Sequence, residues 1–436
     1  MTYAEAEATL LALPRFADAG AAAYNPGLDR MRALLAALGE PHARYPSVHV
    51  AGTNGKGSTA SMVAAIAQAA GRRVGLHTSP HLVTLRERMR VDGVPASEDW
   101  VADAVGRLGD ALADVGPSFF EATVALSFLY FAEADVDLAV VEVGLGGRLD
   151  ATNVLCPVVA AVTHVGLDHT DLLGETLAEI AREKAGIAKA GVPCLHAVED
   201  TEAAAALETE ARARGATVEA VRETCRADPE AGGLRLVTPE ADYGVVEVGL
   251  SGAHQAWNAA LAVRAAEVAS ERARLGALDA EAVRSGLRNV AALSGLRGRG
   301  EVWAADVRVT LDVAHNPDGW QAALDAVRVP EAGRLWALVG AMADKDADAL
   351  AVLLAARHAR TFVVGFPGDR ALSASDLTRR LILRGVEALP VESAAAALRA
   401  FERTAGPDDR MLVTGSHLAV AEILRQTPGN AEGRPF

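Results

Sequence analysis

A glycine-rich stretch near the start of the sequence combines a lysine with hydroxyl residues in an order that suits phosphate binding. The apolar run at residues 48–51 is followed by Gly52-Thr53-Asn54-Gly55-Lys56-Gly57-Ser58-Thr59 and then by a helical pattern. Glycines let backbone N–H groups turn toward an anion, a helix N-terminus adds positive potential, and a lysine supplies a point charge. The stretch therefore predicts a strand, a phosphate-binding loop and a helix.

This loop departs from the common nucleotide-binding pattern G-x-x-x-x-G-K-[ST] at two positions. Val50 stands in the place of the first glycine, and Gly57 separates Lys56 from Ser58. A glycine-rich turn that binds no nucleotide would have a similar composition. The loop alone leaves both interpretations open, so other residues must decide between them.

Polar residues at the ends of two later apolar runs could bind a metal ion. Glu142 lies near the end of the run 138–143, and Asp168 and His169 follow the run 158–165. A buried carboxylate needs a cation, and magnesium prefers one or two carboxylates with phosphate oxygens and water. Glu142 is therefore a candidate magnesium ligand, with an ion pair to Arg148 or to a neighbouring residue as the alternative. His169 is either a ligand or an ordinary histidine.

Lys184 lies within an apolar stripe of a predicted helix over residues 176–189. The stripe has the i, i+3, i+4 spacing of a buried helix face and consists of Leu177, Ile180, Ala181, Ile187 and Ala188. A lysine on such a face extends its amine to the surface, contacts a phosphate, or loses its charge. Carbamylation, the addition of carbon dioxide to the uncharged amine, would turn Lys184 into an anionic metal ligand.

A second polar cluster follows a predicted strand at residues 307–311. It begins with Asp312 and contains His315, and Arg299 precedes the strand. Asp312 suits a ribose or a water-mediated magnesium contact and Arg299 suits a phosphate, although an aspartate before a helix is often only a cap. Charged groups at a domain junction are typical of ligand clefts.

Short apolar runs alternate with helical patterns along most of the chain. Predicted strands cover residues 48–51, 74–78, 138–143, 158–165, 307–311, 335–339, 361–364 and 411–413. This alternation predicts an α/β fold with mostly parallel sheets, and the Gly/Arg-rich stretch 294–300 predicts a boundary between domains at 1–296 and 297–436. Ligands of such sheets bind at the carboxyl ends of strands.

Composition limits the class of protein. The 436 residues are half hydrophobic and carry a formal net charge of −15, which disfavours binding to nucleic acid or to an anionic membrane. The three cysteines form no C-x-x-C pair, the N-terminus lacks signal-peptide features, and no uncharged stretch is long enough to span a membrane. We therefore expect a cytoplasmic globular protein with neither nucleic-acid nor membrane partners.

Taken together, the motifs resemble the folylpolyglutamate synthase family, which includes bifunctional dihydrofolate synthases and belongs to the Mur ligase superfamily of ATP-dependent amide ligases. The resemblance runs essentially from end to end. The matching motifs are GTNGKGST at 52–59, TSPHL at 78–82, FFEAT at 119–123, EVGLGGRLDATNV at 142–154, GLDHT at 166–170, REKAGI at 182–187, GAHQAWN at 252–258, DVAHNP at 312–317, DKD at 344–346 and GS at 415–416. It implies a P-loop ATPase domain and a smaller Rossmann-like C-terminal domain.

The resemblance also implies roles for individual residues. ATP would contact residues 52–59, Asn258, Arg299 and Asp312, with Asn258 at the adenine. Two magnesium ions would be held by Ser79, Glu142, His169 and carbamylated Lys184. The pterin would lie near Tyr24, Asn25, Pro26, Ser118, Phe119, Phe120 and Glu121. The family's usual Pro-Gly-Arg reads Arg297-Gly298-Arg299 here, and its usual preceding Trp is Leu296, so we expect a looser hinge.

The implied reaction joins L-glutamate to a folate or dihydropteroate carboxylate in two steps. ATP phosphorylates the carboxylate, and the glutamate amine attacks the acyl phosphate. Lys56 would stabilise the transferring group and His315 is a candidate proton acceptor. The motifs do not distinguish a dihydrofolate synthase, a folylpolyglutamate synthase, or an enzyme with both activities. We expect a monomer whose partners are these small molecules.

Two other classes of protein remain as alternatives. A cell-wall amino-acid ligase of the same superfamily would carry a UDP-binding domain before the phosphate loop, and the segment before residue 48 is short for one. A GTPase-like switch would need an N-K-x-D motif, which the sequence lacks. The folate ligase is therefore the favoured interpretation.

Overall fold

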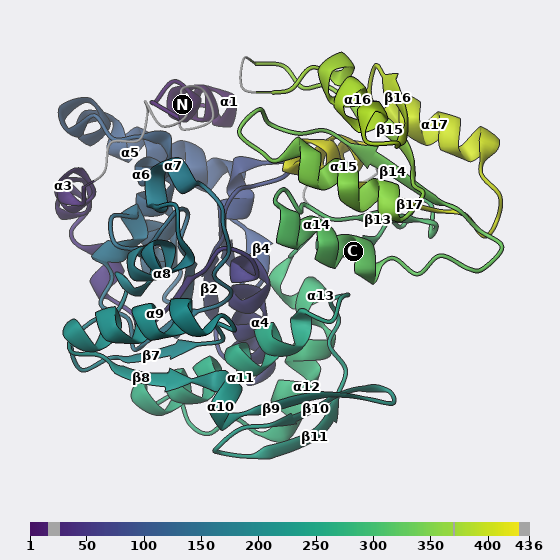
Figure 1. Ribbon diagram of the computed structural model, residues 1–436. Coiled ribbons are helices and arrows are strands. Elements are labelled where there is room, and N and C mark those ends of the chain that lie inside the picture. Colours follow the sequence, from purple (N-terminus) through teal and green to yellow (C-terminus); the bar gives the residue numbers. More distant parts are fainter. Residues whose placement is uncertain (16–26, 369–370, 427–436) are drawn as a thin grey trace. The chain divides into compact units, whose positions relative to one another are not determined.

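The computed structural model describes residues 1–15, 27–368 and 371–426. In it the chain forms two compact units. Within these ranges, the first comprises the residues up to 249 and residues 255–296, and the second comprises residues 250–254 and 297–426. Figure 1 colours the chain from purple at its N-terminus to yellow at its C-terminus. Each unit has its own sheet, so each is described separately. Within the described ranges, no helix is long and apolar enough to cross a membrane.

The first unit is built on an eight-stranded sheet with the strand order β4-β3-β2-β5-β1-β6-β7-β8. Its strands are β1 Ser47–Ala51, β2 Val74–His77, β3 Met89–Val91, β4 Val94–Pro95, β5 Leu138–Glu142, β6 Val159–Val162, β7 Pro193–His196 and β8 Thr217–Ala220. Strands β2, β5, β1, β6, β7 and β8 pair in parallel, whereas β3 and β4 are antiparallel. The prediction of a mostly parallel sheet is confirmed.

The position of β1 explains where this sheet can bind a ligand. All residues of β1, β2, β5 and β6 are buried, as expected for strands covered on both faces. From β1 the chain first continues to β2 on one side of the sheet and later to β6 on the other. Such a reversal of strand order leaves a crevice at the carboxyl ends of the strands. The phosphate-loop sequence lies directly at this point.

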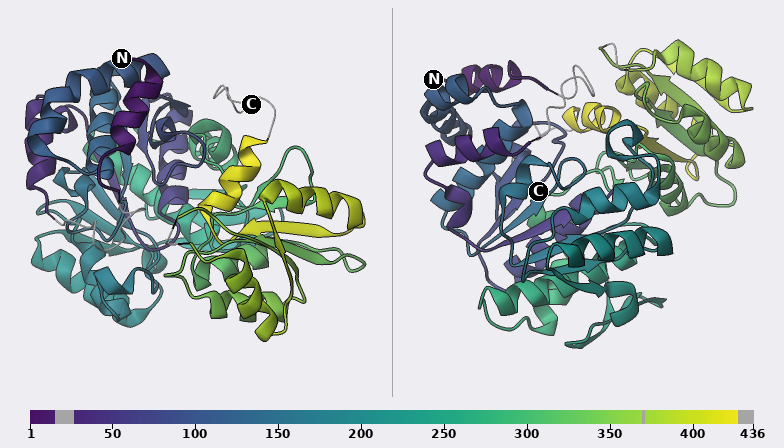
Figure 2. Two further views of the ribbon diagram at one scale, coloured as in Figure 1. Left: turned by 90° about the horizontal axis from the view of Figure 1, so that it is seen from above. Right: turned by 60° about the vertical axis from the view of Figure 1, so that its left-hand side comes forward.

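Helices cover both faces of the sheet, as the views in Figure 2 show. The helices of the first unit are α1 Tyr3–Leu11, α3 Asp29–Ala37, α4 Lys56–Ala69, α5 Glu98–Val115, α6 Phe119–Glu133, α7 Thr170–Leu173, α8 Leu177–Ala185, α9 Thr201–Ala213, α10 Val221–Thr224, α11 Gln255–Arg272, α12 Ala280–Arg288 and α13 Val290–Ser294. Helices α4 and α11 pack on one face. On the other face, α6 covers Val141 and α8 covers Val143.

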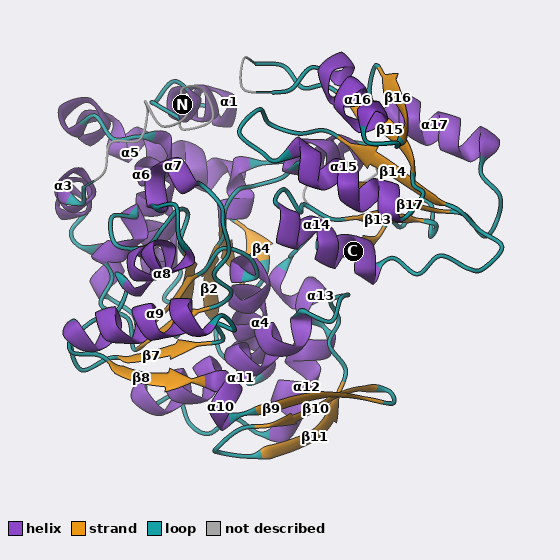
Figure 3. Cartoon of the chain, in the orientation of Figure 1, coloured by secondary structure: helices purple, strands orange, loops and turns teal. Residues whose placement is uncertain are grey.

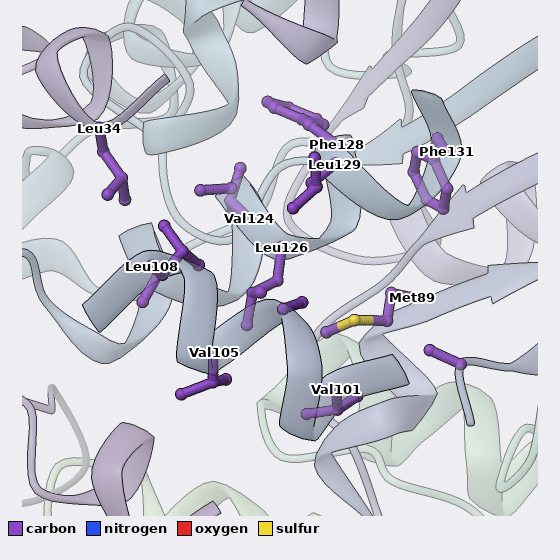
Figure 4. Close-up of a cluster of buried hydrophobic side chains, with 14 of the residues drawn as sticks. Leu34, Met89, Val101, Val105, Leu108, Val124, Leu126, Phe128, Leu129 and Phe131 are labelled. Carbon is purple, nitrogen blue, oxygen red and sulfur yellow. The ribbon is translucent and has the colours of Figure 1, made fainter. Parts of the chain in front are cut away.

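The hydrophobic core beneath α6 joins the N-terminal helices to the sheet. Figure 4 shows its side chains, with Leu34 from α3, Val105 and Leu108 from α5, and Phe128 and Phe131 from α6. Burial of such side chains contributes roughly 1.5–3 kcal/mol each. This core therefore fixes the first turn of α6, which carries part of the predicted pterin site.

A small antiparallel sheet packs against α11. Its strands are β9 Arg226–Glu230, β10 Gly233–Val237 and β11 Asp242–Val246. The buried Glu267 of α11 accepts hydrogen bonds from Thr238 Oγ1 at 2.6 Å and Tyr243 Oη at 2.7 Å, and forms an ion pair with Arg264. This network fixes the small sheet to the helix that also carries Asn258.

The second unit has a six-stranded sheet in the order β12-β13-β17-β14-β15-β16, drawn in orange in Figure 3. Its strands are β12 Glu301–Val302, β13 Val309–Leu311, β14 Leu335–Val339, β15 Arg360–Val364, β16 Glu387–Val391 and β17 Arg410–Thr414. Its helices are α14 Pro317–Ala326, α15 Ala347–Ala356, α16 Ala374–Leu383, α17 Ala394–Thr404 and α18 His417–Arg425. All strands except β12 pair in parallel.

The structure contains edge strands that the apolar runs did not predict. β8 and β16 lie at sheet edges, and their residues are half-buried or exposed. An edge strand needs no continuous apolar run, because one side of it faces solvent. The hydropathy pattern therefore predicts the centre of each sheet better than its edges.

Close helix packing in the first unit gives a testable prediction. A β-carbon at Gly286 of α12 would lie 2.6 Å from Ile66 Cα of α4. Gly286→Ala should therefore lower the free energy of unfolding by about 1–3 kcal/mol. Gly109→Ala in α5 is the matched control, since a β-carbon there meets nothing within 4 Å, and should stabilise by about 0.5–1 kcal/mol. Urea denaturation measures the free energy of unfolding of both variants. Equal changes in the two variants would contradict the close contact between α12 and α4.

Candidate active site

The predicted phosphate loop joins β1 to α4 and is held by the end of β6. A β-carbon at Gly52 would lie 1.9 Å from Thr163 Oγ1, so the close approach requires glycine. Thr163 Oγ1 donates to Asn54 O at 2.6 Å. Thr53 Oγ1 lies 3.0 Å from both Gly166 N and Gly166 O, accepting from the first and donating to the second. The loop is thus fixed from a neighbouring strand, which the sequence pattern did not show.

Two lysine side chains contact carbonyl groups of this loop. Lys56 Nζ donates to Thr53 O at 3.0 Å, and Lys184 Nζ donates to Gly52 O at 3.0 Å. Lys184 is only 2% exposed. Its burial, together with the like charge of Lys56, lowers the pKa of Lys184 to about 7, while Asp168 opposes this shift. Near neutral pH a large fraction of this amine is therefore uncharged.

Glu142 and Ser79 lie side by side at the carboxyl ends of β5 and β2. The Ser79 backbone N–H donates to Glu142 Oε2 at 2.9 Å, and Glu142 is buried. Arg148, one of the alternative partners considered for Glu142, instead forms an ion pair with Glu183 at 2.9 Å, so that part of the alternative is wrong. The structure places a buried carboxylate and a serine together at the predicted ligand edge.

Arg88 is a buried cation near Glu142 that sequence reasoning missed. Burial lowers the pKa of Arg88 to about 10, while the charges of Glu142 and Glu87 oppose this shift. Its Nε donates to His81 Nδ1 at 2.9 Å, and its guanidinium lies 5.1 Å from the centre of the Phe119 ring. No motif or spacing marks Arg88 in the sequence. Only the fold brings it to this position.

His169 directly precedes the short helix α7 as its N-cap residue and has a left-handed backbone conformation, φ 50°. Its Nε2 lies 3.8 Å from Asp168 Oδ1. In the part of the chain that the structure describes, no three His, Cys, Asp or Glu side chains gather closely enough to hold a metal ion. A magnesium site at this edge would therefore also need the hydroxyl of Ser79, a modified Lys184, phosphate oxygens or water.

Asn258 lies beside the phosphate loop on α11, in the same helix layer as α4. It is 8% exposed, and its Nδ2 donates to Gln255 Oε1 at 2.9 Å. A β-carbon at Gly55 would lie 2.4 Å from Asn258 Oδ1. The structure therefore brings this predicted adenine contact to the N-terminus of α4.

The residues of the predicted pterin site at the start of α6 already have structural partners. Ser118 and Glu121 form a capping box, and Glu121 forms an ion pair with Arg30 at 3.1 Å. The ring of Phe120 packs on Gly144, where a β-carbon would lie 2.4 Å from its Cζ. Phe120 is therefore next to the turn that follows Glu142. Tyr24, Asn25 and Pro26, also predicted for this site, lie outside the described residues.

In the second unit, Asp312, Arg299 and His315 gather at the carboxyl end of β13. Asp312 accepts hydrogen bonds from Gly300 N at 2.8 Å and from Ala314 N at 2.9 Å. Burial raises the pKa of Asp312, and the charge of Arg299 opposes this shift. His315 Nδ1 lies 3.1 Å from Val313 O, and because a carbonyl oxygen only accepts, Nδ1 is the donor in this hydrogen bond.

Comparison with known proteins identifies the family to which this chain belongs. Residues 50–266 match the Mur ligase middle domain, and residues 298–417 match the Mur ligase glutamate ligase domain. A Bacillus subtilis protein named dihydrofolate synthase/folylpolyglutamate synthase is 36% identical over 92% of this chain and 95% of its own length. The chain belongs to the folylpolyglutamate synthase and dihydrofolate synthase family of Mur ligases.

Other members of this family agree in fold. The solved structure of Escherichia coli FolC in complex with DHPP and ADP has a TM-score of 0.85 and 29% identity, and the match covers 98% of this chain and 97% of that one. A Haloferax volcanii protein, named probable bifunctional folylpolyglutamate synthase/dihydropteroate synthase, is 39% identical over 97% of this chain. This chain spans about half the length of that relative, 50%.

The buried amine of Lys184 gives a prediction that needs no substrate. Its Nζ should titrate near pH 7. Lys56→Met should raise this pKa because a like charge is removed, and Asp168→Asn should lower it because an opposite charge is removed. The sequence contains four lysines, so NMR of 15N-lysine-labelled protein can follow each amine. A Lys184 amine that titrates near its ordinary value of 10.5 would contradict the burial.

Proposed function

We propose that the chain ligates L-glutamate to tetrahydrofolate and its polyglutamates, and also to 7,8-dihydropteroate, with cleavage of ATP to ADP and phosphate. The observation that carries the proposal is the grouping of the phosphate loop, Glu142 with Ser79, and buried Lys184 at one edge of a single sheet. Family membership supports the same reaction, because the Bacillus subtilis relative is named for both activities.

The first chemical step needs a phosphate site and a nucleotide site. We assign the phosphates to the backbone N–H groups of residues 52–59 and to Lys56, which can move its amine from Thr53 O to a phosphoryl oxygen. Asn258 is the proposed adenine contact, and its place beside Gly55 supports this role. Arg299 and Asp312 are proposed as further ATP contacts. The substrate carboxylate attacks the γ-phosphorus, ADP leaves, and an acyl phosphate forms.

Ser79, Glu142, His169 and carbamylated Lys184 are the proposed protein ligands of two magnesium ions. The donor set fits magnesium in its chemistry, because a buried carboxylate and a hydroxyl are hard oxygen donors. Bound magnesium would neutralise phosphate charge. For carbamylation, the uncharged Lys184 amine forms an N–C bond with carbon dioxide and loses one proton. The lowered pKa of Lys184 and its contact with Gly52 O support this modification.

In the second step, the amine of L-glutamate displaces phosphate from the acyl phosphate. This amine must first lose a proton, and we propose His315 Nε2 as the acceptor, since Nδ1 donates to Val313 O. Phe119 and Phe120, with Ser118 and Glu121 at the start of the same helix, are proposed to border the pterin, together with residues 24–26. Phe120 supports this placement because it packs beside the turn after Glu142.

We also propose two domains, at residues 1–296 and 297–436, in a cytoplasmic monomer without nucleic-acid or membrane partners. All three cysteines are free, which supports a reducing compartment. Sedimentation velocity of the purified protein tests the oligomeric state, and a dimer at working concentration would exclude the monomer.

Incorporation of labelled glutamate tests the proposed function. The purified protein should ligate glutamate to tetrahydrofolate and to 7,8-dihydropteroate, each in a separate assay and only with ATP. Incorporation with one acceptor alone would reduce the proposal to that activity, and incorporation only with a UDP-muramyl acceptor would overturn it. In the same assay His315→Ala should lower turnover, and unchanged turnover at every pH would exclude it as the proton acceptor.

Three substitutions at Lys184 test its proposed carbamylation. Lys184→Ala should lower kcat about 100-fold or more, the scale of a lost transition-state contact, and added formate or acetate should restore part of the activity. Lys184→Arg and Lys184→Met serve as the matched pair, because only the first keeps the positive charge and neither can be carbamylated. If Lys184→Arg retained activity while Lys184→Met lost it, the lysine would act as a cation, and the carbamate would be excluded.

A further inference from the structure

His49 is a buried histidine of β1 that the proposed mechanism does not use. It is fully buried, and in the sheet it pairs with Val141 of β5, the residue directly before Glu142. Its Nε2 lies 2.8 Å from Thr152 Oγ1, in the short 3-10 helix Ala151–Val154. A polar side chain buried this deeply needs a reason, and its partners supply one.

The hydrogen atoms along this contact can be assigned from the partners of Asp150. The Asp150 carboxylate accepts hydrogen bonds from the backbone N–H groups of Leu145 and Thr152, both at 2.9 Å, and from that of Gly144. Thr152 Oγ1 also donates to Asp150 Oδ1. A hydroxyl carries a single hydrogen. Because Thr152 gives it to Asp150, His49 must donate its Nε2–H to Thr152.

The other ring nitrogen of His49, Nδ1, is consistent with a hydrogen on Nε2. Among the described residues, His49 Nδ1 has no hydrogen-bond partner, as fits an unprotonated nitrogen rather than an orphaned donor. Burial, and to a lesser degree the charge of Lys189, lowers the pKa of His49 to about 3. His49 is therefore a neutral Nε2–H tautomer across the physiological pH range.

We infer that His49 is a positioning residue for the turn that follows Glu142, acting through hydrogen bonds from its Nε2 to Thr152, from Thr152 to Asp150, and from the Leu145 N–H to Asp150. Each hydrogen bond in this relay fixes the orientation of the next. Leu145 lies three residues after Glu142, and Phe120 packs on the intervening Gly144. The inference rests on the proposed function, because it concerns Glu142 as a magnesium ligand.

Removal of the Nε2–H donor should loosen this turn and weaken magnesium binding. His49→Phe keeps the ring volume without the donor, and Thr152→Val keeps the shape of the side chain without the hydroxyl. Each should weaken the magnesium-dependent binding of ADP about tenfold, as expected when a residue that orients a metal ligand is lost. His49→Gln retains an N–H donor and should restore most of the affinity. The double variant His49→Phe/Thr152→Val should be no weaker than either single variant.

His196→Phe is the matched control. His196 is also buried at 2% exposure in the same sheet, and its Nε2 contacts Glu208 Oε1 of α9 at 3.2 Å rather than the turn after Glu142. This variant should lower Tm and leave magnesium-dependent ADP binding unchanged. Calorimetric titration of ADP at several magnesium concentrations, together with Tm, measures all five variants.

Two results would overturn the inference. The first is a His49→Phe protein whose Tm is lowered as in His196→Phe but whose ADP binding depends on magnesium as in the wild-type protein. The second is 15N NMR of the wild-type protein that shows a protonated Nδ1 on His49. If His49→Phe does not fold, the ADP binding of Thr152→Val and the NMR measurement still test whether His49 positions the turn. A wild-type protein that binds magnesium and ADP but ligates no glutamate would overturn the proposed function and leave the relay supported.

Discussion

The amine of Lys184 is held beneath the phosphate loop, within hydrogen-bond distance of Gly52 O and with almost no exposure to water. Burying a charged amine is costly, so burial lowers the pKa of Lys184 to about 7 and favours its uncharged form. The fold requires this placement, because the apolar stripe of α8 packs on the sheet and carries the lysine with it. This contact helps to hold the loop, and the proposed chemistry of the site depends on the lysine that makes it.

One segment, residues 144–154, connects this lysine to the carboxylate at the end of β5. Asp150 holds the turn after Glu142, and Asn153 Nδ2 donates to Arg148 O at 2.9 Å and to Gly186 O at 3.1 Å, just beyond Lys184. A β-carbon at Gly186 would lie 2.3 Å from Arg148 Cβ, so the two backbones can meet only at a glycine. The positions of Glu142 and Lys184 are thus set together.

The sequence was informative wherever burial or spacing leaves a pattern. Apolar runs predicted most of the central strands, although β7 in the interior of the first sheet was missed. The helical stripe of residues 177–188 placed Lys184 on the apolar helix face but left open whether its amine reaches the surface. Sequence patterns could not show which distant segments come into contact. Examples are the contact of Thr163 with Gly52, the position of Arg88 near Glu142, and the ion pair of Arg148 with Glu183. These depend on which strands become neighbours, and hydropathy along one strand carries no information about its neighbour. Edge strands escaped prediction for a related reason, since half of their surface is solvated.

The central claim is that the phosphate loop, Lys56 and Glu142 serve a ligase that activates a carboxylate as an acyl phosphate. The most direct measurement uses 7,8-dihydropteroate with 18O in both carboxylate oxygens, turned over with ATP and L-glutamate, followed by mass analysis of the products. An acyl phosphate predicts one 18O atom transferred to each inorganic phosphate released, with ADP unlabelled. Released phosphate without 18O, or 18O found in AMP, would contradict the account.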